Sequence, residues 1–79
     1  MIRVFLVDDH EIVRRGVADL INAQRALEVV GESADVKHTV PRTDPTMPDV
    51  VVLDVRLPDG NGIDLCRDIR SRHDSIYCL

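Results

Sequence analysis

The stretch VFLVDDHEIVRRG, residues 4–16, joins a short apolar run to a segment whose apolar residues recur with helical spacing. The apolar run is largely β-branched and aromatic, which favours a strand buried on both faces over residues 2–7. The spacing from Glu11 to Ala23 predicts an amphipathic helix, with Arg14 and Arg15 turned toward solvent. The apolar face of this helix comprises Val13, Val17, Leu20 and Ile21.

The remaining chain continues to alternate strands and helices. LEVVGES (residues 27–33) and DVVVLDV (49–55) predict two further strands, and SIYCL (75–79) begins a fourth. IDLCRDIRSR (63–72) predicts a helix that follows the turn residues LPDGNG (57–62). This order of elements predicts an α/β domain whose parallel sheet is built from right-handed crossovers.

Prolines complicate the segment between the second and third strands. A helix is expected to begin near Ala34, but Pro41 removes an amide donor and disfavours the helical conformation at Val40. Pro45 and Pro48 follow closely. The sequence therefore predicts a short or broken helix here.

Composition and charge limit the classes of function. The chain has 79 residues, enough for one small domain, and a formal net charge of −4, which does not favour binding to DNA, RNA or an anionic membrane surface. The apolar run at the N-terminus is too short for a signal peptide or a membrane span, so a cytoplasmic location is expected. Cys66 and Cys78 lack the spacing of a zinc site and are interpreted as reduced packing thiols.

Acidic residues follow two of the predicted strands. Asp8 and Asp9 end the first strand and Asp54 ends the third, and ligands of parallel sheets bind beyond the carboxyl ends of strands. If these strands are neighbours, the three carboxylates converge and repel one another unless a cation joins them. Magnesium suits such oxygen ligands, and Asp54 beside it could act as a nucleophile toward phosphorus. The product would be an aspartyl phosphate.

LVDDHEIVRRG (residues 6–16) and VVVLDVRLPDGNG (50–62) resemble the receiver domain of bacterial two-component response regulators. The family pattern is a pair of aspartates, an acceptor aspartate at the end of the third strand, and a following LPDGNG loop. The amino-acid sequence of these two stretches is most similar to that of regulators with a LuxR/NarL-type helix-turn-helix output domain. The resemblance implies a flavodoxin-like (CheY-like) fold, of which residues 1–79 hold about four strands and three helices of the usual five and five. Residues 1–79 would be the N-terminal part of a receiver domain, with the DNA-binding output domain outside this chain.

The resemblance also implies roles for individual residues. Asp54 would accept a phosphoryl group from a sensor histidine kinase. Asp9 would bind Mg²⁺ directly, Asp8 directly or through water, and Arg56 through its backbone carbonyl. The family's Ser or Thr at the end of the fourth strand and its Lys at the end of the fifth would lie beyond Leu79.

Other polar residues receive structural interpretations. His10 is next to the acidic pair and could touch the metal or hold the loop, but a histidine at a helix start is usually solvated, which is the expectation here. His38 and His73 are expected at the surface. Asp59 and Asp64 are expected to cap or line the turn.

Two alternatives to a switching module remain open. A magnesium-dependent phosphohydrolase of the haloacid dehalogenase type also uses an aspartate nucleophile, but it needs a second Asp two positions on, where this chain has Arg56 after Asp54 and His10 after Asp8. A fragment that self-associates without switching is the other alternative. An exposed fourth strand beside an apolar patch predicts that the isolated chain forms a dimer or larger assembly through its C-terminal edge.

Overall fold

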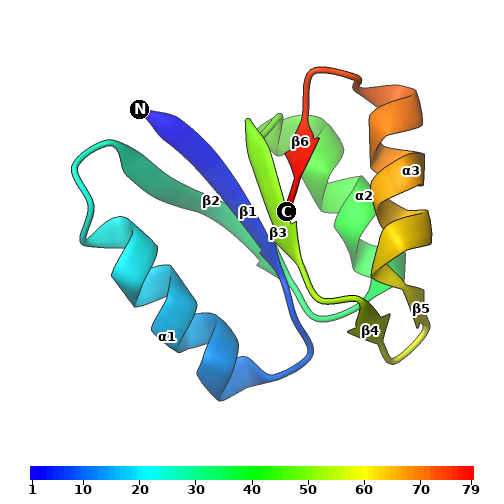
Figure 1. Cartoon of the computed structure of the whole chain (residues 1–79), viewed down its shortest axis with the longest axis horizontal. Coiled ribbons are helices and arrows are strands. Elements are labelled where there is room, and N and C mark those ends of the chain that lie inside the picture. Colours follow the sequence, from blue (N-terminus) through cyan, green and yellow to red (C-terminus); the bar gives the residue numbers. More distant parts are fainter.

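A parallel sheet in the order β2-β1-β3-β6 forms the centre of the structure, a computed structural model that describes residues 1–79 (Figure 1). Its strands are β1 (Ile2–Val7), β2 (Leu27–Ser33), β3 (Val50–Leu53) and β6 (Tyr77–Cys78). A separate antiparallel hairpin comprises β4 (Arg56–Leu57) and β5 (Gly60–Asn61). The helices are α1 (Glu11–Asn22), α2 (Val36–Thr46) and α3 (Gly62–Arg72). The expected parallel α/β architecture is confirmed, and β1 and β3 are direct neighbours.

Helices cover both faces of the sheet, with α1 on one side and α2 and α3 on the other (Figure 1). Alternate residues of a strand point to opposite faces. Phe5 and Val7 of β1 accordingly pack with α3, whereas Val4 and Leu6 pack with Ala18 of α1. The strands are therefore apolar on both faces, as the continuous apolar runs in the sequence predict.

The buried face of α1 is narrower than predicted. Val17 and Ile21 pack against the sheet as expected, but Val13 is 52% exposed and Leu20 is 70% exposed. The contact with the sheet is centred on Ala18, the one fully buried residue of α1. The face of α1 that contacts the sheet therefore comprises Val17, Ala18 and Ile21.

Helix α2 is continuous over 11 residues, so the prediction of a short or broken helix is wrong. Lys37, Pro41 and Pro45 follow one another at intervals of four and form an exposed stripe of the helix. The carbonyls that lose a proline N–H partner therefore face water, which can hydrogen-bond them. The opposite side carries Thr39 and Thr43, which are almost completely buried and anchor the helix.

The cysteines occupy packing positions. Both are free thiols and half-buried, and Cys78 contacts the main core. Burial and the neighbouring Cys66 thiol raise the pKa of Cys78 to about 12, so this thiol stays protonated at neutral pH.

None of the three helices combines the length and apolar character that crossing a membrane requires.

Candidate functional site

The ends of β1 and β3 bring two of the predicted site residues to the same edge of the sheet. The backbone N–H of Asp54 donates to the carbonyl of Val7 at 3.0 Å, which extends the pairing of the two strands past their last residues. On the other side of β1, the N–H of Asp8 donates to the carbonyl of Ser33 at 3.1 Å. Asp8 and Asp54 are thus held at adjacent strand ends by backbone hydrogen bonds.

The three predicted carboxylates converge. One side-chain ligand atom from each of Asp8, Asp9 and Asp54 lies within 4.8 Å of the others, and a ring nitrogen of His10 belongs to the same group. Asp8 and Asp54 are half-buried, whereas Asp9 and His10 are exposed. The convergence is as the sequence predicts, but His10 is not merely a solvated residue, because it contacts the acidic pair.

His10 is held against Asp8 by two contacts. Asp8 Oδ1 accepts the backbone N–H of His10 at 2.8 Å and lies 2.8 Å from its Nδ1. Asp9 Oδ1 is 3.1 Å from the same nitrogen. The Asp8 side chain and the charge of Asp9 raise the pKa of His10. Partial burial opposes ionisation of Asp8, but the hydrogen bonds from His10 outweigh it and lower the pKa of Asp8.

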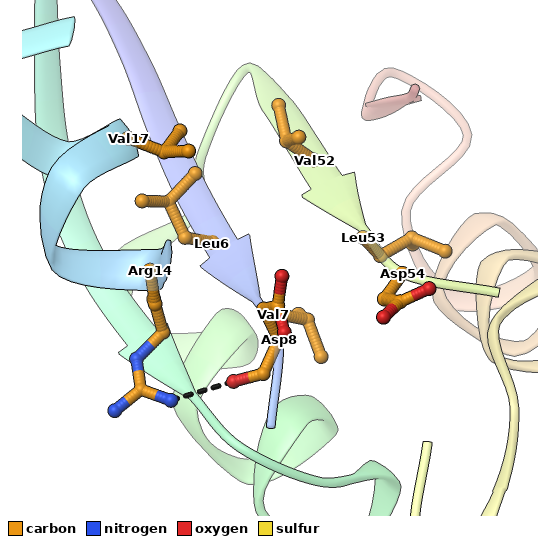
Figure 2. A pocket seen from close by; sticks show the side chains of 8 residues that line it. All are labelled: Leu6, Val7, Asp8, Arg14, Val17, Val52, Leu53 and Asp54. Atoms are coloured by element: carbon orange, nitrogen blue, oxygen red, sulfur yellow. Dashed lines mark hydrogen bonds between the residues drawn. The ribbon is translucent and has the colours of Figure 1, made fainter. Parts of the chain in front are cut away.

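Arg14 departs from the prediction that it faces solvent. Its side chain is 17% exposed and crosses the end of β1, where Nε donates to Glu32 at 3.0 Å and a terminal nitrogen donates to the carbonyl of Asp8 at 2.5 Å (Figure 2). Helical spacing gives the direction of Cβ only, and a long side chain can turn back along the protein surface. Arg15 is 75% exposed, as expected.

A groove of about 350 Å³ adjoins the acidic group. Leu6 and Val17 lie on one side and Val52 on the other, with Asp8 and Asp54 at the end of the groove (Figure 2). The carboxylates therefore border an apolar surface between α1 and β3 rather than open solvent on every side. This lower local polarity strengthens their interactions with cations.

The LPDGNG segment forms the turn of a short hairpin with part of its two strands, β4 and β5. Arg56 pairs with Asn61, and the N–H of Arg56 lies 3.3 Å from Asp54 Oδ1. Gly62 follows the hairpin and lies directly against the acceptor residue, because a Cβ at this position would overlap the carbonyl oxygen of Asp54. Glycine is therefore required here by close packing.

Asp59 caps a helix other than the one that follows it. Its two carboxylate oxygens accept the backbone N–H groups of Val36 at 2.7 Å and Lys37 at 3.0 Å, in the first turn of α2. The sequence indicated a cap but not this partner. Asp64 lies in the first turn of α3 with its side chain 76% exposed, and the cap of α3 is Asn61.

The two remaining histidines differ in their surroundings. His38 is 53% exposed and lies 2.8 Å from Asp35, as expected for a surface residue. His73 is 25% exposed and lies 2.8 Å from Asp44, which also accepts a hydrogen bond of 2.7 Å from Arg72. His73 thus lies in polar surroundings at the surface, as expected, but it is half-buried in a cluster that joins α2 to the end of α3.

Known proteins resemble this chain in sequence and in fold. The DNA-binding transcriptional activator DevR/DosR of Mycobacterium tuberculosis is 58% identical over 79 residues, all of this chain and 36% of that protein. The crystal structure of a LuxR-family two-component response regulator from Aurantimonas sp. SI85-9A1 has a TM-score of 0.92 at 40% identity, over 98% of this chain and 55% of that one. The signal receiver domain of the putative response regulator NarL from Mycobacterium tuberculosis has a TM-score of 0.91 at 31% identity. The match covers 99% of this chain and 63% of that one.

These likenesses confirm the CheY-like receiver fold that the motifs imply. The chain spans about a third of the length of DevR/DosR, so its match concerns one part of that protein. The family model of the response regulator receiver domain matches residues 4–79, which include the paired aspartates and the strand that ends at Asp54. The chain therefore belongs to the response regulator receiver domain family.

Proposed function

We propose that this chain is the phosphoacceptor module of a two-component transcriptional regulator, in which Asp54 takes a phosphoryl group from a sensor histidine kinase in the cytoplasm. The observation that carries the proposal is the convergence of Asp54 with Asp8 and Asp9 within 4.8 Å. DNA would be contacted by an output domain outside this chain. The description of DevR/DosR as a DNA-binding transcriptional activator supports that assignment.

The donor set fits Mg²⁺. Magnesium prefers oxygen ligands and keeps several waters, and three partly exposed carboxylates at one sheet edge supply oxygens while leaving room for water. Asp9 and Asp54 would bind the cation directly, Asp8 directly or through water, and Arg56 through its backbone carbonyl. When bound, the cation supplies positive charge that offsets the negative charge of the incoming phosphoryl group.

Asp54 performs the covalent step. One of its carboxylate oxygens attacks the phosphorus of a phosphohistidine, an O–P bond forms, the N–P bond breaks, and the imidazole leaves with the electron pair and takes up a proton. The N–H of Arg56 orients Asp54 Oδ1 at 3.3 Å, which leaves Oδ2 as the free nucleophile. The hydrogen bond from the N–H of Asp54 to Val7 keeps the residue at the sheet edge.

The test is labelling of the full-length protein with acetyl phosphate in the presence of Mg²⁺, because residues 1–79 alone, without the family's Lys, are expected to be labelled poorly. Intact mass is expected to increase by one phosphoryl group in the wild type, and peptide mapping is expected to place the group on Asp54. Asp54→Asn should abolish labelling, whereas Asp64→Asn should retain it because Asp64 is exposed and is not part of the acidic group. Equal labelling of wild type and Asp54→Asn, or no labelling of wild type, would contradict the proposal.

A further inference from the structure

The thiols of Cys66 and Cys78 meet at a place in the fold that the proposed phosphoacceptor site does not use. Cys66 belongs to α3 and Cys78 to the edge strand β6. The two side chains are hydrogen-bonded neighbours, with the S–H of Cys78 donating to the sulfur of Cys66. The sequence contains two cysteines in all, so each is the other's one possible disulfide partner within the chain.

A groove gives small molecules access to both sulfurs. Its volume is about 280 Å³, and Cys66, Cys78 and Arg67 are among the residues that line it. Both cysteines are half-buried rather than enclosed. Arg67 adds a positive charge to the groove, and reactive thiols occur in such partly exposed, electropositive surroundings. An oxidant of the size of hydrogen peroxide can therefore reach the pair.

Strand β6 can make the small movement that a covalent bond between the sulfurs requires. A disulfide brings two sulfurs from contact to about 2.0 Å. β6 is two residues long and pairs with β3 on one side only, as the last strand of the sheet. Little else in the fold has to shift when the bond forms.

We propose that Cys66 and Cys78 are a redox modification site, at which a peroxide oxidant converts the two thiols into a reversible disulfide that joins α3 to β6. The sulfur of Cys66 first attacks a peroxide oxygen, the O–O bond breaks, and Cys66 becomes a sulfenic acid as one water leaves. The sulfur of Cys78 then attacks the sulfenic sulfur, an S–S bond forms, the S–O bond breaks, and the hydroxide leaves with the proton of Cys78 as a second water. Two thiols are oxidised and one peroxide is reduced.

The surroundings of the two thiols set the order of these steps. The thiolate is the nucleophile, and burial together with the hydrogen bond to Cys66 raises the pKa of Cys78 to about 12. Cys78 also packs against the main core. Cys66 is therefore the residue that attacks the oxidant, and Cys78 is the residue that resolves the sulfenic acid.

The first experiment treats the reduced 79-residue chain with one equivalent of hydrogen peroxide. The intact mass of the monomer is expected to fall by two hydrogen atoms, iodoacetamide should then label neither cysteine, and dithiothreitol should restore both thiols. Cys78→Ser should stop at a sulfenic acid that dimedone traps, whereas Cys66→Ser should be oxidised at least about tenfold more slowly. Equal rates in the two variants, or a sulfinic acid in the wild type without a disulfide, would overturn the inference.

A second measurement separates a contact made by the fold from chance closure, because cysteines this close in sequence also pair in an unfolded chain. Equilibration of the wild type with a glutathione redox buffer gives the effective concentration of the thiol pair, in native buffer and in urea. The native value is expected to be at least about tenfold higher, since the fold holds the sulfurs in contact. An equal or lower native value, or mainly disulfide-linked dimers, would refute the site even where a serine variant fails to fold.

Discussion

Asp59 Oδ1 accepts a hydrogen bond of 2.7 Å from the backbone N–H of Val36, 23 residues earlier in the chain. The second oxygen of Asp59 accepts the N–H of Lys37 at 3.0 Å. The hairpin that follows Asp54 is thereby attached to the N-terminus of α2. A negative charge at this end also interacts favourably with the helix dipole.

Loss of this cap should destabilise the fold. Asp59→Ala is expected to lower the free energy of unfolding by about 1–2 kcal/mol, because two N–H groups lose their acceptor. The control Asp64→Ala removes an exposed carboxylate from the first turn of α3 and should cost less than about 0.5 kcal/mol. Urea denaturation measures both, and equal losses would contradict the role of Asp59.

Two glycines should respond in opposite directions to alanine. Gly62→Ala places a Cβ against the carbonyl of Asp54 and is expected to cost about 1–3 kcal/mol. Gly16→Ala, in the exposed part of α1 with no atom within 4 Å of the new Cβ, should stabilise by about 0.5–1 kcal/mol. Thermal unfolding ranks the wild type and the two variants by stability. A Gly62→Ala protein as stable as the wild type would refute the close contact between Gly62 and Asp54.

Arg14 should contribute more to the free energy of unfolding than its neighbour Arg15. Arg14→Gln removes the contacts to Glu32 and to the carbonyl of Asp8 from a side chain that is 17% exposed, and should cost about 1.5–3 kcal/mol. Arg15→Gln removes an exposed pair with Glu11 at 3.3 Å and should cost at most about 0.5 kcal/mol. Chemical denaturation of the two variants provides the comparison, and similar values would show that Arg14 is equally dispensable.

The cluster at the ends of α2 and α3 should make stability depend on pH. Hydrogen bonds from Arg72 and His73 lower the pKa of Asp44 below its ordinary value. A lowered pKa means that the contribution of Asp44 is present above the unfolded value, about 3.9, and is lost as the pH falls through the lower folded value. Wild type should therefore exceed Asp44→Asn in stability at pH 6, and the difference should shrink below about pH 4.

Denaturant midpoints between pH 3 and pH 7 test this dependence on Asp44. Asp19→Asn is the control for loss of one negative charge, since Asp19 lies on the exposed side of α1. A difference between wild type and Asp44→Asn that is the same at every pH would show that the carboxylate does not act through its charge.

Self-association through β6 is the remaining prediction. β6 is an edge strand of the sheet, and Tyr77 and Leu79 are 68% and 78% exposed. We expect the weight-average mass of the chain to rise with concentration, because an apolar sheet edge favours pairing with a second chain. Leu79→Lys should reduce association, whereas Leu20→Lys, on the 70% exposed Leu20 of α1, should not. Sedimentation equilibrium measures the mass. A wild-type chain that stays monomeric at all micromolar concentrations would refute self-association through β6.

Much of the site followed from local patterns in the sequence. Continuous apolar runs end at Asp8 and at Asp54, and strands that alternate with helices must be parallel, so their carboxyl ends share one edge. The convergence of these acids was therefore predictable once the strands were recognised. The burial of Leu65 and Ile69 also agrees with helical spacing, whereas the cap of α3 is Asn61 rather than one of the expected aspartates.

Contacts between distant segments were decided only by the tertiary structure. Helix α2 stays whole because its prolines fall on the exposed stripe while Thr39 and Thr43 are anchored inside, and proline content alone does not reveal which side packs. Asp59 caps a helix 23 residues away, and Arg14 turns from its own helix to Glu32. Spacing along the chain sets the direction in which a side chain leaves the backbone, but long side chains and helix caps take whichever partners packing brings within hydrogen-bond distance.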